Sequence, residues 1–235
     1  QTENIWSGMM SDLWKNPLED FSGKMPIFPL PNVVFFPHTF LPLHIFEERY
    51  RAMVADATNG EKLICMALLK PGYEDDYEGS PPIHSVGTVG FMPMKKDHAD
   101  GTSDILLVGM DKVKIKEITS DTPYRMAEVE ILHDVVGESD PEALQEKIFQ
   151  QFNVLNDDNL LSAATQFFSE GLDFEMAVNL VISHLEIEGE EKQKLLELGD
   201  LSLRAKVLLQ YLESGLRVDL AADFGIGFAG DLRMN

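Results

Sequence analysis

Six histidines and a single cysteine are the side chains of this chain best suited to metal binding or nucleophilic chemistry. No histidine pair has the H-E-x-x-H spacing, and none lies near the cysteine at the spacing of a zinc site. His44 and Glu47 are three residues apart, but a hydrogen-bonded histidine fits this position better than a metal ligand. Cys65 lies among apolar residues, which predicts a buried and unreactive thiol. We expect no metal ion and no cysteine catalysis.

Two glycine-containing segments resemble motifs that bind phosphate or a dinucleotide. Gly23-Lys24 lacks the rest of a phosphate-binding loop, because Met25 follows the lysine and Leu18 occupies the place of the first glycine. Residues 225–230 match G-x-G-x-x-G, but only five residues follow them, and that motif needs an acidic residue about 20 positions further on. We expect no cofactor and no catalytic residue, although a Ser-His-Asp triad assembled in space stays open.

The stretch from Pro26 to Val54 changes from an extended segment to a helix. Five prolines each fix φ and remove a backbone donor, and the apolar residues between them suit a buried strand. From Ile45 onward, apolar residues recur at helical spacing and charged residues occupy the other face. Asn59-Gly60 then supplies a helix stop. The pattern predicts a proline-rich strand that leads into a short amphipathic helix.

Apolar or alternating segments separated by turn residues predict further strands up to residue 132. These segments are Leu63–Leu69, Val86–Met94, Ile105–Val108, Lys112–Ile118 and Tyr124–Leu132. Strict alternation in the fourth segment predicts that its lysines, Lys112, Lys114 and Lys116, point outward.

The pattern changes at Asp140, where proline becomes rare and apolar residues recur with a helical period. Asp140, Pro141 and Glu142 have the sequence of an N-cap, a proline in the first turn and an acidic first turn. Further helices are predicted at Leu160–Gly171, Asp173–Leu185, Glu190–Leu198 and Leu201–Leu216. In the last of these, Leu203 is predicted to face a core.

The chain is therefore predicted to be an α+β protein with four parts. They are an N-terminal arm (1–24), a β-rich part (25–136), a helical bundle (137–218) and a C-terminal tail (219–235). Two tryptophans in the arm predict that it packs on the body or on a neighbouring copy, which would allow self-association through the arm.

Charge and cysteine content restrict the partners and the compartment. The chain carries 40 acidic against 19 basic residues, a net charge of −21. Nucleic acids and anionic membranes are bound through clustered Lys and Arg, so we expect neither as a partner. No apolar run approaches the roughly 20 residues of a membrane span, and residues 1–24 do not have the pattern of a secretory signal. A single cysteine favours a reducing compartment, and we expect a cytoplasmic protein.

Five segments carry a resemblance to one family. They are PIFPLPNVVFFPHTFLPLHIFEERYRAMV at 26–54, VGTV at 86–89, GMDKVKI at 109–115, PYRMAEV at 123–129 and AVNLVISHLEIEGEEKQKLLELGDLSLRAKVLLQYL at 177–212. Together, over residues 25–214, they resemble the N-terminal, substrate-binding domain of Lon protease, a family related to the Lon-like domain of cereblon. One departure is Lys112, which stands where the family usually has arginine.

The resemblance implies a PUA-like pseudo-barrel of antiparallel strands followed by an α-helical bundle. It also implies a role in gripping unfolded or tagged proteins for an ATPase and a protease. Because only a tail follows Arg217, we expect a stand-alone form without the ATPase and peptidase modules of Lon.

We therefore predict a non-enzymatic module that binds client proteins or peptides, with a separate ATPase or protease as a further partner. Its binding surface is expected in the crease between barrel and bundle, where Phe and Met side chains offer adaptable apolar contacts. The candidate peptide-binding residues are Phe35, Phe36, His38, Phe40, Phe91 and Met92.

A small-molecule binder or a hydrolase built on the same barrel is the alternative. It predicts a deep cavity in which two or more titratable groups converge. Glu47, Arg49 and Tyr50 could form such a polar pocket, although an ion pair and a hydrogen bond that hold the helix against the barrel fit them better.

Overall fold

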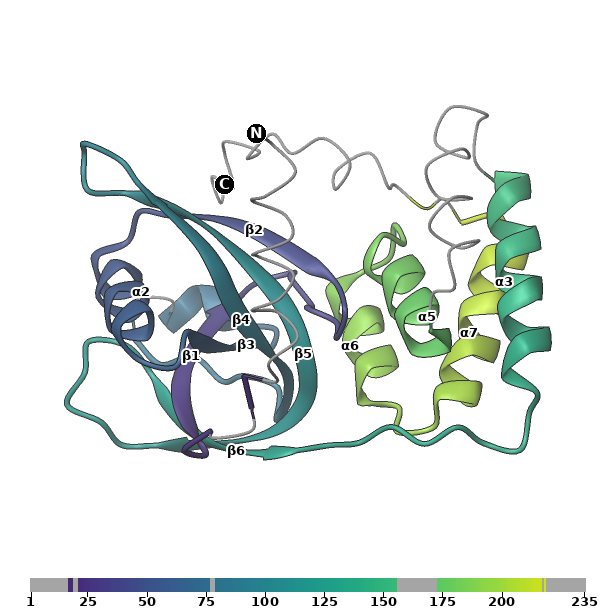
Figure 1. Ribbon diagram of the computed structural model, residues 1–235, viewed down its shortest axis with the longest axis horizontal. Helices are drawn as coiled ribbons and strands as arrows, with labels where there is room; N and C mark the ends of the chain where they lie inside the picture. Colours follow the sequence, from purple (N-terminus) through teal and green to yellow (C-terminus); the bar gives the residue numbers. More distant parts are fainter. Residues whose placement is uncertain (1–16, 19–20, 77–78, 156–172, 217, 219–235) are drawn as a thin grey trace, which may run out of the picture.

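The computed structural model describes residues 17–18, 21–76, 79–155, 173–216 and 218 of the 235-residue chain. Strands come first and most of the helices second, so the fold is α+β. Figure 1 shows the strands as a strongly curved sheet on the left and the later helices as a separate group on the right. The predicted arm helix, the helix predicted at Leu160–Gly171, the tail and the glycine motif at 225–230 lie outside the described residues.

Six strands form one sheet. They are β1 (Lys24–Leu30), β2 (Phe40–Ile45), β3 (Leu63–Leu68), β4 (Val86–Asp97), β5 (Ser103–Ile118) and β6 (Met126–Ile131). Their order is β2-β5-β4-β3-β1-β6, and β6 also pairs with β5, so that five strands close into a barrel. The first part of β5 pairs with β2 and its last part with β6. The two strands predicted at Ile105–Val108 and Lys112–Ile118 are therefore one continuous strand.

The prediction of a wholly antiparallel barrel is wrong, because β1 and β3 pair in parallel, with Ile27 aligned to Cys65 and Leu30 to Leu68. Parallel neighbours need a long crossover connection. Here the connection contains β2 and the helix α2 (Glu48–Asn59). The predicted helix stop is confirmed, since Gly60 follows α2 and its N–H donates to the carbonyl oxygen of Ala57 at 3.1 Å.

The central strand β3 is buried on both faces, which explains its uninterrupted apolar sequence LICMAL. Ile64 and Met66 pack in a core cluster that includes residues of α2. Leu63 and Cys65 point the other way, into a second cluster with residues of β1, β4, β5 and β6. The barrel is thus packed with side chains on either side of β3.

Four described helices follow the barrel: α3 (Pro141–Leu155), α5 (Phe174–Ser183), α6 (Gly189–Glu197) and α7 (Leu201–Glu213). The predicted N-cap is confirmed, because the Asp140 carboxylate accepts hydrogen bonds from the backbone N–H groups of Glu142 (3.0 Å) and Ala143 (3.3 Å). Helices α3, α5 and α7 pack around one apolar cluster, and α6 contacts β4 of the barrel. Within the part of the chain that the structure describes, no helix is both long and apolar enough to cross a bilayer.

The prediction that Leu203 faces a core is wrong, because its side chain is 46% exposed. The buried face of α7 carries Leu201, Ala205, Leu208 and Leu212, which recur every three or four residues. Leu203 lies on the other side of this helix.

Lys112 points out of the barrel as its alternation predicts, but it is not exposed to solvent. The residue is only 4% exposed, because its side chain leaves the barrel and enters the interface with the bundle. There the Lys112 ammonium donates to the Asp134 carboxylate and to the carbonyl oxygen of Leu198 (3.1 Å). Arg204 of α7, fully buried, donates to the same carboxylate at 2.5 Å and to Asn179 Oδ1 at 2.9 Å. A buried network of two cations and one anion thus joins barrel to bundle.

Candidate functional site

The outer face of β2 exposes several large apolar side chains. Phe40, Pro42, His44 and Phe46 occupy alternate positions and are all exposed, whereas Leu43 between them is buried. Phe40 is 54% and Phe46 53% exposed. Contiguous exposed apolar surface of this kind commonly marks a contact site.

Strand register extends this surface across β5 to β4. Phe40 is aligned with Val108 of β5, which is aligned with Phe91 of β4. Pro42 is aligned in the same way with Leu106, and Leu106 with Met94. A bulge between Phe91 and Met94 keeps both on the outer face. We call the resulting apolar surface the outer stripe: Phe40, Pro42, Phe46, Phe91, Met94, Leu106 and Val108.

Three of the six predicted binding residues are buried. Phe35 and Met92 belong to the barrel cluster that includes α2, and Phe36 belongs to the cluster of the bundle. The loop that carries both phenylalanines is held to the barrel, because Thr88 Oγ1 donates to the carbonyl oxygen of Phe35 at 2.6 Å. These three side chains therefore pack inside the barrel and bundle clusters and do not reach the surface.

The other three predicted residues are accessible. Phe40 and Phe91 belong to the outer stripe, but Phe91 is half-buried and packs in part against the cluster that contains Leu63 and Cys65. His38 is exposed in the crease, with its Nε2 atom 4.0 Å from a carboxylate oxygen of Glu175 on α5. Phe46 was missed as a surface residue because it also fits the helical spacing that starts at Ile45. The signal that reveals it is the alternation of β2, which continues one step beyond the strand.

A second feature missed from the sequence is a cluster of two histidines on one carboxylate. His44 Nδ1 lies 2.7 Å from Asp104 Oδ1, and His98 Nε2 lies 2.7 Å from Asp104 Oδ2. Burial of Asp104 acts to raise its pKa, but the hydrogen bonds from His44 and His98 outweigh burial and lower the pKa below its usual range. The prediction of a hydrogen-bonded His44 is confirmed, with Asp104 as the partner.

Arg49 and Tyr50 border a hollow, but Glu47 is not part of its lining. Arg49 Nε donates to Glu47 Oε2 at 2.9 Å, and the guanidinium lies 4.7 Å from the centre of the Tyr50 ring. The Tyr50 ring is buried against Phe28 of β1, with 4.3 Å between ring centres. The Tyr50 ring thus fastens α2 to the barrel.

One hollow, of about 470 Å³, is lined by Asn32 and by residues 186–189 and 191. Another, of about 300 Å³, lies beside the Tyr50 contact and is a second place for the small-molecule alternative. Its titratable lining groups are bonded to protein partners. Arg125 Nη2 donates to Glu117 Oε2 at 2.6 Å, and the Tyr124 hydroxyl donates to Asp56 Oδ2 at 2.7 Å. Side chains paired in this way are not converging on a substrate, so this second hollow does not favour the enzyme or small-molecule alternative.

The buried thiol makes a simple test of the core. Cys65 is fully buried, and burial raises the pKa of its thiol to about 12. We expect no reaction with a disulfide reagent such as Ellman's at mildly alkaline pH in the native protein, and one reacting thiol per chain after unfolding in guanidinium chloride. Stoichiometric reaction of the native protein within minutes would contradict this packing.

Comparison with known proteins identifies the family. Residues 24–214 match the family model described as the ATP-dependent protease La (LON) substrate-binding domain. The chain belongs to this family. The Lon substrate-binding domain is a non-catalytic part of those proteases.

Full-length relatives share the same region. The chain is 29% identical over 199 residues to the Lon protease of Anaeromyxobacter dehalogenans, covering 83% of this chain and 23% of that protein. It is 31% identical over 190 residues to Lon protease 2 of Syntrophobacter fumaroxidans, covering 77% and 23% respectively. The chain thus spans about a quarter of the length of these curated relatives.

Two solved Lon domains share the fold. The N-terminal domain of Mycobacterium avium complex Lon protease superposes with a TM-score of 0.66 at 14% identity, covering 81% of this chain and 98% of that one. The Lon N-terminal domain protein from Xanthomonas campestris gives 0.59 at 20% identity, covering 80% and 98%.

Proposed function

We propose that this Lon substrate-binding domain binds segments of unfolded or tagged client proteins on the outer stripe and presents them to an ATP-dependent protease. The observation that carries the proposal is the exposure of Phe40, Phe46 and Met94 (39%) on one face of the barrel. Family membership supports the substrate-binding role. Of the predicted site residues, Phe40 and Phe91 are retained as contacts on the outer stripe and His38 as a contact in the crease, whereas the buried Phe35, Phe36 and Met92 pack in the cores.

The free edge of β2 favours an extended segment as the bound form. Among the described strands, β2 pairs with β5 alone, so its other edge can offer N–H and C=O groups to an added strand. Backbone pairing is independent of client sequence, and apolar contacts with Phe40 and Phe46 would select segments with alternating apolar residues. Pro42 lacks an N–H and limits how far such pairing extends.

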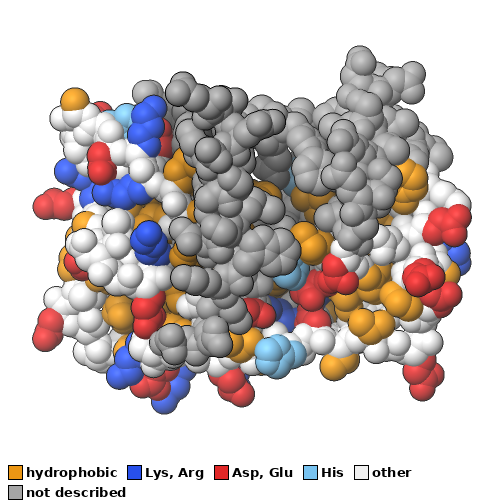
Figure 2. All heavy atoms as spheres, viewed as in Figure 1, with side chains coloured by type: hydrophobic (Ala, Val, Ile, Leu, Met, Phe, Trp, Pro, Cys, Tyr) orange, Lys and Arg blue, Asp and Glu red, His pale blue; other side chains and the backbone are white. Residues whose placement is uncertain are grey.

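In the architecture that we propose for this role, a PUA-like barrel (25–136) carries the surface and the helical bundle (137–218) braces it. Figure 2 shows basic side chains mainly over the barrel, at left, whereas acidic side chains lie over both the barrel and the helices. With a net charge of −21, the whole domain favours clients that are not acidic.

Peptide binding tests the proposal. The probe is a short fluorescent peptide in which Leu and Phe alternate with Ser and Lys, and the measurement is fluorescence anisotropy. Replacing both Phe40 and Met94 by Ser should weaken binding by about tenfold or more, because at least ~1.4 kcal/mol of apolar contact is lost.

Leu203→Ser is the matched control, since Leu203 is equally apolar and exposed but lies on α7. It should change the affinity less than twofold. The proposal fails if the unmodified chain does not bind the peptide, or if the control weakens binding as much as the double variant, while circular dichroism shows both variants folded.

A further inference from the structure

Three metal-ligating side chains meet at the end of the barrel beside the outer stripe. His44 and His98 each lie 2.7 Å from a different oxygen of Asp104, and their ring centres are 5.9 Å apart. One ligand atom from each residue lies within 4.8 Å of the other two. Among the described residues, this is the one group of three such side chains close enough to share an ion.

Backbone structure holds the three residues together. Strand pairing aligns His44 of β2 with Asp104 of β5. His98 begins the turn between β4 and β5, and its N–H donates to the carbonyl oxygen of Thr102 at 2.9 Å, which folds the turn back over Asp104. The His44 ring also stacks on Phe46, with 6.3 Å between ring centres. The ligand geometry therefore does not depend on one flexible loop.

The ligand types of these three residues favour one class of metal ion. Two imidazole nitrogens and one carboxylate oxygen suit zinc and its neighbours, whereas calcium and magnesium prefer oxygen ligands alone. The carboxylate is 9% exposed, and the histidine side chains are 40% and 31% exposed, so an ion can reach them from solvent. Lys96 is aligned with Asp104 on the other side of β5, but it is exposed, and solvent screens its charge.

We propose that His44, His98 and Asp104 form a binding site for a zinc-class divalent ion. The ion takes the place of the ring protons that now bridge each histidine to the carboxylate. Each neutral imidazole then binds the ion through that nitrogen and carries its proton on the other ring nitrogen. The ligand atoms need to separate by roughly 0.6–0.9 Å, because tetrahedral zinc ligands at ~2.0–2.2 Å from the metal stand about 3.3–3.6 Å apart. Three protein ligands leave a fourth position for water. The bound ion would tie β2 to the β4–β5 turn at the end of the outer stripe.

Metal titration tests this site independently of client binding. The chain, without an affinity tag and stripped of metal by a chelator, is titrated with zinc chloride by calorimetry and with cobalt chloride by visible absorption. We expect saturation at one ion per chain and the visible bands of cobalt in a four- or five-coordinate site. His98→Gln and Asp104→Asn, which keep hydrogen-bonding groups in place, should each weaken zinc binding by about tenfold or more.

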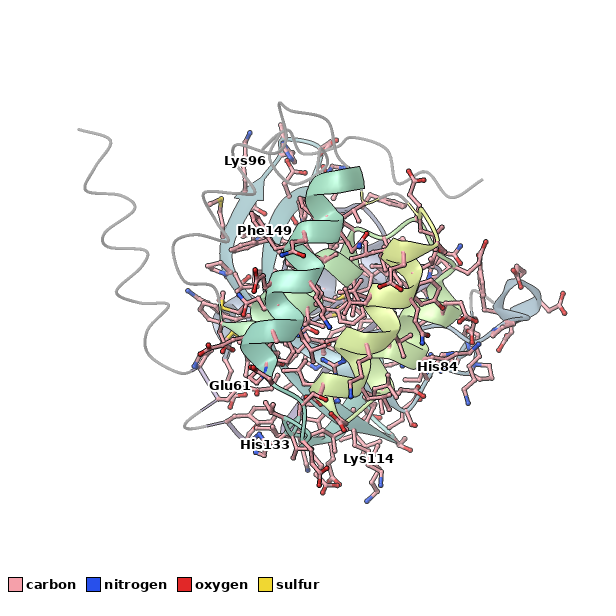
Figure 3. The ribbon with its side chains drawn as sticks, turned by 90° about the vertical axis from the view of Figure 1, so that its right-hand side faces the viewer. Glu61, His84, Lys96, Lys114, His133 and Phe149 are labelled. Atoms are coloured by element: carbon pink, nitrogen blue, oxygen red, sulfur yellow. The ribbon has the colours of Figure 1, made fainter. Side chains whose placement is uncertain are left out.

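The matched control is His133→Gln, which should change zinc affinity less than twofold. His133 is exposed, and Figure 3 shows it at the opposite end of the molecule from Lys96. If Asp104→Asn does not fold, His98→Gln carries the comparison, because His98 lies in a turn and is partly exposed. The site is disproved if neither metal saturates at one ion per chain, or if His98→Gln binds zinc as tightly as the unmodified chain.

Discussion

Asp134→Ala is expected to lower the free energy of unfolding by about 3–5 kcal/mol, because it leaves two buried cations without their shared anion. The Asp134 carboxylate and Lys112 are each 4% exposed, and Arg204 is fully buried. Burial lowers the pKa of Lys112, and Arg204 acts in the same direction, while the hydrogen bond from Lys112 to Asp134 raises it. Urea unfolding followed by circular dichroism measures the loss.

The stability of this variant should also change with pH in a direction that can be predicted. Without Asp134, the folded-state pKa of Lys112 falls further below its unfolded value, so the unfolded chain binds more protons. The stability deficit of Asp134→Ala should therefore shrink as the pH rises towards the unfolded-state pKa of lysine, ~10.4. Adding Lys112→Met to the Asp134→Ala protein should recover part of the lost free energy of unfolding, because one unpaired buried cation is removed.

Matched controls separate this effect from the loss of any surface charge. Glu138→Ala removes an exposed carboxylate from the same connection, and Lys114→Met removes an exposed lysine from the same strand. Each should change stability by less than about 0.5 kcal/mol. A cost for Asp134→Ala no greater than that for Glu138→Ala would show that the network does not join barrel to bundle in solution.

Phe36→Ala is expected to destabilise the protein by about 3–5 kcal/mol, the usual cost of emptying a phenylalanine site in a core. The Phe36 side chain is fully buried in the cluster formed by the bundle helices, although it comes from the loop between β1 and β2. The variant should therefore loosen the bundle as well as the barrel. Amide hydrogen exchange should show faster exchange in α5 and α7.

Phe40→Ala is the control, four residues along the same segment. Because Phe40 is 54% exposed, this change should cost less than about 1 kcal/mol of stability. Equal losses for the two variants would mean that the loop does not place Phe36 inside and Phe40 outside.

Local patterns predicted most of the elements. The apolar run of β3, the Asn59-Gly60 stop and the Asp140 cap are each decided by neighbouring residues, and each lies where its pattern predicts. The alternation of β2 is equally local, so the exposure of Phe40 and Phe46 could have been predicted from period two alone.

The features that could not be predicted depend on contacts between residues far apart in the sequence. His44 and Asp104 are 60 positions apart and meet only because β2 and β5 pair in one register. Lys112 has the alternation of an exposed lysine, and only the bundle that covers this part of the barrel buries it. The parallel pairing of β1 with β3 likewise depends on a crossover that no single segment reveals.

Site-specific photo-cross-linking tests the central claim, that clients bind on the outer stripe, most directly. A benzophenone side chain placed at Phe40, and in a second protein at Leu203, is irradiated with the fluorescent Leu/Phe peptide. Both positions are exposed and apolar, but they lie on β2 and α7 respectively. We predict a cross-link from position 40 that excess unlabelled peptide suppresses, and only background from position 203. Equal labelling from both positions, or a competed cross-link from position 203 alone, would contradict the account.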